Sequence, residues 1–166
     1  MKILVLYYSK GGNTRKLAEA VAEGVGQAEG VEAVLRHTRD VSQDDFVDAD
    51  GLIAGSPVYF GTMAAELKSV LDEFVGVRRK MENKVGAAFA TAGDASGGKE
   101  TTMLSIIQAL LIYGMIIAGD PMSATGHYGT ACVGAPDEAT LENGRKLGQR
   151  VAELAKRIHP HETVSR

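Results

Sequence analysis

Apolar residues occur along the chain in two alternating patterns, short continuous runs and segments with helical spacing. Continuous apolar runs are typical of parallel strands that are covered on both faces. Such runs predict strands at 3–8, 50–55, 84–90 and 115–118, and a more polar run at 31–38 predicts an edge strand. Each run has the length of one strand, so the chain offers five candidate strands.

Between these runs, apolar residues recur at intervals of three and four positions, which places them on one face of a helix. The spacing is clearest over 67–74, and it returns over 17–25 and 147–158. The segment 100–113 is apolar on nearly all sides, which predicts a buried helix. The acidic pair Asp137–Glu138 precedes the last helix, where it complements the positive end of the helix dipole.

Strands that alternate with helices predict an α/β fold of three layers, a doubly wound five-stranded parallel sheet with strand order 2-1-3-4-5. We expect residues 1–158 to form a single domain and residues 159–166 to be a frayed C-terminal tail. Ligands of such sheets bind beyond the carboxyl ends of the strands, at the switch point between the first and third strands. The loops after the first, third and fourth strands are therefore the candidate site.

Composition and charge remove several classes of function. The 166 residues include 18 basic and 21 acidic ones, and a net charge of −3 argues against a nucleic-acid partner. The longest apolar stretch, 103–115, is too short to span a membrane. No cluster of cysteine and histidine has the spacing of metal ligands, so we expect no metal site. The single cysteine, Cys132, fits a reducing, cytoplasmic location.

Glycine is the one unusual component, with 20 residues. Average usage near 7% would give about 12 in a chain of this length. Seven glycines fall in the three candidate loops, and four more follow the fifth predicted strand. We therefore interpret the excess mainly as backbone left without side chains where a ligand approaches.

The first candidate loop has the composition of an anion-binding cradle. It runs from Ser9 to Thr14 and joins a buried strand to the start of a helix, with hydroxyl groups at both ends and glycines between them. Backbone N–H groups and the dipole at a helix N-terminus bind phosphate well. The alternative is a plain turn in which Asn13 or Thr14 caps the helix.

The second candidate loop places aromatic residues beside this cradle. Ser56 and Pro57 follow the third strand, and Tyr59 and Phe60 are adjacent in a chain with nine aromatic residues. Exposed aromatic rings next to a phosphate site suit a flat, partly apolar ring system. The alternative is that one of the two rings folds into the core.

The third candidate loop resembles a nucleoside triphosphate motif only in part. Gly93 and the Gly98–Lys99 pair have the required spacing, but Glu100 stands where a hydroxyl group should hold Mg²⁺. A carboxylate there would repel the phosphates, which argues against a nucleotide triphosphatase. We expect this loop to approach the ligand ring through its backbone amides instead.

These motifs, in this order, resemble the flavodoxin-like FMN proteins, among them the NAD(P)H:quinone oxidoreductases of the tryptophan-repressor-binding type and their short flavodoxin relatives. The resemblance extends over about residues 2–158. Residues 4–14 resemble the family's first strand and phosphate loop, 55–61 its ring-binding segment, 91–101 its third flavin loop, and 113–115 and 127–129 its later signatures. The insertion that links the second and third strands in the larger reductases is missing here.

The resemblance implies FMN as the cofactor and NAD(P)H as co-substrate. It assigns FMN contacts to three loops and to one later residue: Ser9, Lys10, Gly11, Gly12, Asn13, Thr14, Pro57, Val58, Tyr59, Phe60, Gly61, Thr91, Ala92, Gly93, Asp94, Gly97 and Tyr128. His127 and Tyr128 are candidates for hydrogen bonding near the ring, and no residue is assigned as an obligatory catalytic acid or base.

Two functions agree with such a site. In one, NAD(P)H reduces the flavin, which then reduces a quinone or similar acceptor by two electrons. In the other, the protein is a flavodoxin that carries single electrons between redox proteins. Such carriers are often strongly acidic, because charge steers them to basic partners. A net charge of −3 gives little steering and favours the reductase, which we expect to assemble as a homodimer or higher homo-oligomer.

Overall fold

One seven-stranded sheet runs through the computed structural model, which describes residues 1–159. Its main path has the order β2-β1-β3-β5-β6, and all neighbours on this path are parallel. β7 also pairs with β5 in parallel, and β4 forms an antiparallel hairpin with β3. The strands are β1 (Lys2–Tyr7), β2 (Glu32–His37), β3 (Gly51–Tyr59), β4 (Thr62–Met63), β5 (Val85–Ala92), β6 (Ile116–Ile117) and β7 (Thr130–Val133).

The predicted order 2-1-3-4-5 is confirmed, but the fifth position is divided between two short strands. β6 pairs with Val85 and Gly86 at the start of β5, whereas β7 pairs with the stretch from Phe89 to Ala92 at its end. The chain leaves the sheet between them, over residues 118–129. The sequence prediction missed β7 because four residues, only half of them buried, carry no clear strand pattern.

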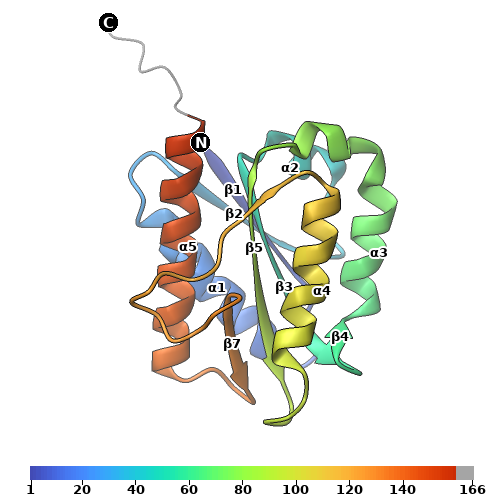
Figure 1. The fold of residues 1–166 in the computed structure, drawn as a ribbon, viewed down its shortest axis with the longest axis vertical. Helices are drawn as coiled ribbons and strands as arrows, with labels where there is room; N and C mark the ends of the chain where they lie inside the picture. Colours follow the sequence, from blue (N-terminus) through green and yellow to red (C-terminus); the bar gives the residue numbers. More distant parts are fainter. Residues whose placement is uncertain (160–166) are drawn as a thin grey trace, which may run out of the picture.

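Helices cover both faces of the sheet. Figure 1 shows α1 and α5 on one side and α3 and α4 on the other. The short α2 packs on the second side, since its Phe46 belongs to the core beneath α3 and α4. The helices are α1 (Asn13–Gly26), α2 (Gln43–Asp48), α3 (Ala65–Glu73), the 3₁₀ helix η1 (Phe74–Met81), α4 (Lys99–Ile112) and α5 (Glu138–Ile158).

Two of these helices correct the sequence reading. The prediction contained no α2, although Ser42 and Asp45 form a reciprocal capping box at its start that a serine–x–x–acid pattern could have revealed. The predicted burial of the helix over 100–113, which is α4 in the structure, is only half right. One face of α4 is buried, but Leu104, Leu111 and Ile112 on the outer face are 37%, 56% and 66% exposed.

The sheet separates two hydrophobic cores. Leu4 and Leu6 of β1 face the core under α3 and α4, whereas Ile3 and Val5 of the same strand face the core under α1 and α5. This alternation follows from the two-residue period of a strand. Both faces of β1 are therefore buried, as the continuous apolar run predicts.

Several glycines serve packing instead of ligand binding, which corrects the interpretation of their excess. A Cβ atom on Gly55 would lie 1.9 Å from the Phe89 ring. Within the α1–α5 layer, a Cβ on Gly24 would lie 1.9 Å from the Arg145 carbonyl oxygen, and one on Gly148 would lie 2.0 Å from a backbone oxygen of α1. These glycines let backbone and side chains approach closely.

The end of the described chain is attached to the fold. His159, the first residue of the predicted frayed tail, donates its backbone N–H to Ala155 and places its ring nitrogen Nε2 3.2 Å from the Asn83 carbonyl oxygen. Residues 160–166 of the predicted tail lie outside the described residues. Among residues 1–159, none of the helices combines the length and apolar character that crossing a bilayer requires.

Candidate functional site

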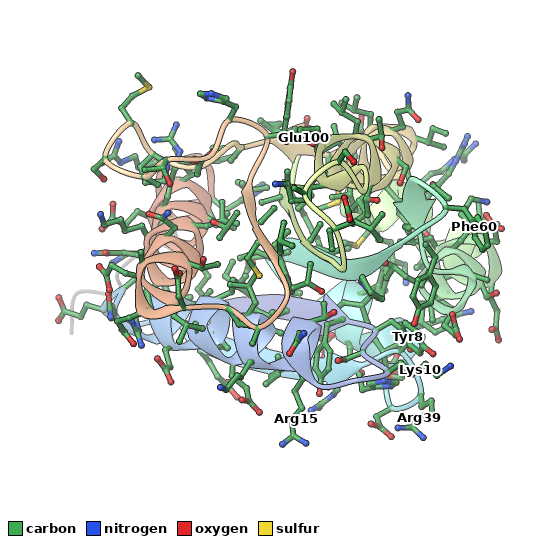
Figure 2. The ribbon with its side chains drawn as sticks, turned by 90° about the horizontal axis from the view of Figure 1, so that it is seen from below. Tyr8, Lys10, Arg15, Arg39, Phe60 and Glu100 are labelled. Atoms are coloured by element: carbon green, nitrogen blue, oxygen red, sulfur yellow. The ribbon has the colours of Figure 1, made fainter. Side chains whose placement is uncertain are left out.

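The three candidate loops lie at one edge of the sheet. The strands direct their carboxyl ends to the bottom of Figure 1, and Figure 2 looks onto this edge. Tyr8 and Lys10 lie together at one corner in Figure 2, while Phe60 projects at the side and Glu100 lies across the edge from them. Contacts between the loops decide whether they form one site.

The first loop leaves the N-terminus of α1 without a side-chain cap. Gly12 is the N-cap residue with φ 94°, a left-handed conformation that favours glycine. The Ser9 hydroxyl accepts a hydrogen bond from the Gly12 N–H at 3.1 Å. The alternative of a plain turn capped by Asn13 or Thr14 is therefore wrong. The first N–H groups of α1, with the positive end of its dipole, are directed to this loop and can bind an anion such as a phosphate.

The two basic residues near this loop, Lys10 and Arg15, differ in whether they are free to meet a ligand. Arg15 is engaged on its own helix, because its Nε atom lies 2.8 Å from a carboxylate oxygen of Glu19. Lys10 is exposed at the tip of the loop. Lys10 is thus the better placed of the two to meet a phosphate group.

A buried hydrogen bond joins the first loop to the third. The Oγ1 atoms of Thr14 and Thr91 lie 2.8 Å apart, and both residues are almost completely buried. Thr14 lies in the first turn of α1 and Thr91 is the next-to-last residue of β5, so the bond links segments 77 positions apart in sequence. The two predicted FMN loops therefore meet.

The second loop is largely strand and turn. β3 continues through Pro57 and Val58 to Tyr59, and the chain then reverses over Phe60 and Gly61 into β4. The φ angles of Phe60 and Gly61 are 51° and 78°, the positive pair that a tight two-residue hairpin requires. Predicting a loop from Ser56 onward was wrong, since Pro57 pairs within the sheet.

Both aromatic rings of this hairpin stay outside the core. Phe60 is fully exposed and Tyr59 is 36% exposed, so the alternative that one ring is buried is wrong. A bulky side chain in the left-handed region costs about 1–2 kcal/mol, and such conformations concentrate at functional sites. The hairpin therefore holds the Phe60 ring exposed at this edge at the expense of local stability.

The second and third loops approach each other closely at Gly61. The Thr101 hydroxyl donates a 2.6 Å hydrogen bond to the Gly61 carbonyl oxygen. A Cβ atom on Gly98 would lie 3.0 Å from the Gly61 Cα atom, so the approach requires glycine there. All three predicted loops are thus joined, the first to the third through Thr14 and the third to the second through Gly61.

The third loop carries a local turn centred on Asp94. The Asp94 carboxylate accepts hydrogen bonds from the backbone and hydroxyl groups of Ser96, which hold its pKa below the usual value. Gly97 closes the turn by donating its N–H to the Asp94 carbonyl oxygen at 3.1 Å. The loop is therefore ordered by its own groups, with Gly93 free of side-chain crowding.

The two candidates from the later signature lie farther along the same edge. His127 and Tyr128 are exposed and line a small cavity of about 180 Å³ with Lys99 and Glu100 at the start of α4. No described contact joins them to the first or second loop. Their role near a flavin ring stays a prediction.

The sequence reading missed Tyr8 and Glu66 as part of this edge. The pKa of the Tyr8 phenol is raised to about 12, first by its interaction with the Glu66 carboxylate and then by desolvation. The Tyr8 ring lies edge-on to Tyr59, with centroids 6.3 Å apart, and 5.7 Å from the ring of His37. Tyr8 was counted as the end of a strand. Its place beyond the last paired residue was the signal that could have revealed it.

Comparison with known proteins agrees with this geometry. Residues 37–130 match the family described as NADPH-dependent FMN reductase. A flavodoxin from Aquifex aeolicus is 36% identical over 158 residues, which cover 92% of this chain and 85% of that protein. An NAD(P)H dehydrogenase (quinone) from Archaeoglobus fulgidus is 34% identical over 188 residues, which cover 95% and 98%.

A solved structure extends the similarity to three dimensions. The flavodoxin, WrbA-like protein from Agrobacterium tumefaciens superimposes with a TM-score of 0.83 at 25% sequence identity. The match covers 95% of this chain and 99% of that one. The arrangement of sheet and helices is therefore shared over almost the whole length of both proteins.

Proposed function

This chain belongs to the NADPH-dependent FMN reductase family of flavodoxin-like proteins, and from this premise we propose that it is an FMN-dependent NAD(P)H oxidoreductase that reduces quinones or similar acceptors. In this reaction NAD(P)H loses two electrons and a proton as a hydride. The quinone gains two electrons and two protons, the second proton coming from solvent, and becomes a hydroquinone.

The observation that carries the proposal is the joining of three loops at an uncapped helix N-terminus. The α1 N–H groups and the Ser9 hydroxyl suit the phosphate of FMN, and Lys10 adds a positive charge. The Tyr59–Gly61 hairpin and the 91–97 loop, held together through Thr101, suit the flavin ring on its two sides. The residues present therefore fit the cofactor.

Bound FMN would supply the chemistry by accepting a hydride and passing the electrons on. The residues of this chain would bind and orient it. Phe60 would cover the ring with an apolar surface, and backbone amides of the glycine-rich 91–97 loop would approach its polar edge. The Tyr8 phenol, whose pKa is raised to about 12 by its interaction with the Glu66 carboxylate, stays protonated at neutral pH and holds its ring beside Tyr59 at this edge.

One observation favours the alternative of a one-electron carrier. The alignment with the Archaeoglobus dehydrogenase spans 188 positions, more than this chain has, so that protein contains insertions that this chain lacks. The alignment with the Aquifex flavodoxin spans 158 positions. In length the chain is thus closer to the flavodoxin, while its small net charge favours the reductase.

The remaining expectations belong to the same proposal. We propose a single FMN-binding domain over residues 1–158, a cytoplasmic location and assembly as a homodimer or higher homo-oligomer. If the protein is a carrier, we propose that its partner is a second redox protein and not a small-molecule acceptor. Cys132 is buried, and desolvation raises its pKa to about 11, which keeps the thiol protonated and unreactive.

Reconstitution with FMN followed by steady-state kinetics tests the proposal. We expect a yellow protein that oxidises NADPH or NADH when a benzoquinone is present, and that releases FMN on denaturation. Failure to bind added FMN would refute the cofactor assignment. If FMN binds but stays oxidised under NAD(P)H without oxygen, the protein is the carrier, and a stable neutral semiquinone in a dithionite titration would support that alternative.

A further inference from the structure

A groove of about 760 Å³ opens beside the hairpin, between the start of α3 and the outer face of α4. Its volume lies in the range of small-molecule sites. The groove is mostly apolar, and it is lined by Tyr59, Phe60, Met63, Ala65, Ala109 and Ile112, with polar residues among them. None of these six residues except Tyr59 and Phe60 belongs to the predicted FMN site.

Two of the polar side chains that line the groove, Ser105 and Lys68, already have hydrogen-bond partners within the protein. The Ser105 hydroxyl accepts a hydrogen bond from the Met63 N–H at 3.2 Å and donates one to the Thr102 carbonyl oxygen at 2.7 Å. The Lys68 ammonium lies 2.7 Å from both carboxylate oxygens of Asp72. The groove therefore favours an occupant that needs few hydrogen bonds, which a hydrocarbon satisfies and a peptide backbone does not.

The groove has a direction and a length. The Ser105–Met63 bond places Ser105 next to the hairpin, and Ile112 lies two turns farther along α4. A helix rises 1.5 Å per residue, so this distance is about 10 Å, the length of a short prenyl or alkyl chain. One end of the groove is the Tyr59–Phe60 segment, and the other end is the exposed Ile112 side chain.

On the basis of the proposed function, we propose that this groove binds the hydrocarbon tail of an amphipathic quinone. The redox-active head then lies at Tyr59 and Phe60, beside the predicted flavin ring, and the tail extends over Ala109 to Ile112. This explains why α4 keeps the apolar Ile112 on a face that the fold leaves exposed. It also assigns the acceptor to a class, benzoquinones or naphthoquinones with a prenyl or alkyl tail.

Kinetics with a matched pair of quinones test this assignment on the FMN-loaded full chain. The pair is 2,3-dimethoxy-5-methyl-1,4-benzoquinone without a tail and the same ring with a decyl tail. We expect a KM at least tenfold lower for the tailed quinone at similar kcat. Ile112→Glu should remove this preference without changing the KM of the tailless quinone. Leu111→Glu is the matched control, since Leu111 is the exposed neighbour outside the groove, and it should keep the preference.

Calorimetric titration of the decyl quinone without NAD(P)H separates this inference from the proposed function. If neither quinone is reduced, the proposed function is wrong, and the titration still decides about the groove. Binding that Ile112→Glu weakens and Leu111→Glu preserves supports the groove. Equal binding by both variants and the native chain would overturn it. So would a native dimer in sedimentation that Ile112→Glu alone dissociates, with no tail preference, because a second copy would then cover the groove.

Discussion

The helices on the two faces of this sheet pack in different ways. Under α1 and α5, glycines at positions 24 and 148 let two helix backbones approach so closely that a single methyl group would collide with a carbonyl oxygen. On the side of α3 and α4, a groove of about 760 Å³ remains open beside the hairpin, between the start of α3 and the outer face of α4. One face is closed by packing, and the other stays accessible beside the candidate site.

Helices α5 and α3, which lie on opposite faces of the sheet, also begin differently. α5 starts at Asp137, which caps it, and its Arg145 forms ion pairs with Glu23 of α1 and with Glu138 and Glu142 of its own helix. α3 starts at Ala64, which has no side-chain cap. The Arg145–Glu23 pair joins α5 to the last turn of α1 and so adds to the packing of the closed face.

The largest expected effect comes from closing the space between α1 and α5. Gly148→Ala should lower the free energy of unfolding by about 3 kcal/mol, because its Cβ would lie 2.0 Å from the Val21 carbonyl oxygen. Gly76→Ala on η1 is the control, since nothing lies within 4 Å of its Cβ position, and it should change stability by at most about 0.5 kcal/mol. Urea denaturation measures both, and equal losses would contradict the contrast between the faces.

A smaller effect is expected at the phosphate end of the closed face. The double variant Ser9→Ala with Thr14→Ala should weaken FMN binding by ~2–3 kcal/mol, since the Ser9 hydroxyl loses a charge-assisted hydrogen bond to the phosphate and Thr14 loses its buried bond to Thr91, which joins two of the loops. Flavin fluorescence quenching measures the affinity. Thr14→Ser keeps a hydroxyl and should retain most of it, and Gln108→Ala in the groove should leave it unchanged. Unchanged affinity in the double variant would show that the phosphate binds elsewhere.

The smallest effect concerns the cap of α5. Asp137→Ala should lower Tm by a few degrees at neutral pH, because the carboxylate accepts hydrogen bonds from the Thr140 hydroxyl and N–H. These bonds hold the pKa of Asp137 below its usual value. The stabilisation is therefore fully present above the unfolded pKa and is lost as pH falls through the lower folded pKa.

Thermal unfolding across this range of pH checks the sign of that effect. The Tm values of the native chain and of Asp137→Ala should converge in acid. Asp137→Asn keeps an acceptor oxygen that does not titrate, so its Tm difference from the native chain should also shrink as pH falls. A constant gap between the native chain and Asp137→Ala would show that the lost stability does not come from the charged cap.

Much of the fold was predictable because strands and helices are encoded locally. The apolar run at 3–8 falls within β1 apart from Tyr8, and the helical spacing at 67–74 falls within α3 and the first residue of η1. The division of the fifth strand was not predictable, since β7 owes its place to pairing with the end of β5 and not to its own four residues. The exposed outer face of α4 was equally hidden, because hydropathy records which residues are apolar and not what covers them.

The candidate site was likewise predictable from the sequence only in part. The residues of the three loops were found from composition and order, since glycine, hydroxyl and aromatic groups stand directly after strand-like runs. Their union depends on contacts such as Thr14 with Thr91 and Gly61 with Gly98, which join segments far apart in the chain. Tyr8 and Glu66 entered the site only through this proximity.

The sequence by itself determined the class of fold, the order of the strands and the positions of the candidate loops, because periodicity and turn residues act over short distances along the chain. Only the tertiary structure decided which helical face closes and which stays open, and that Phe60 points outward beside an apolar groove. Those outcomes depend on how surfaces from distant segments fill the space between them, and no local pattern contains that information.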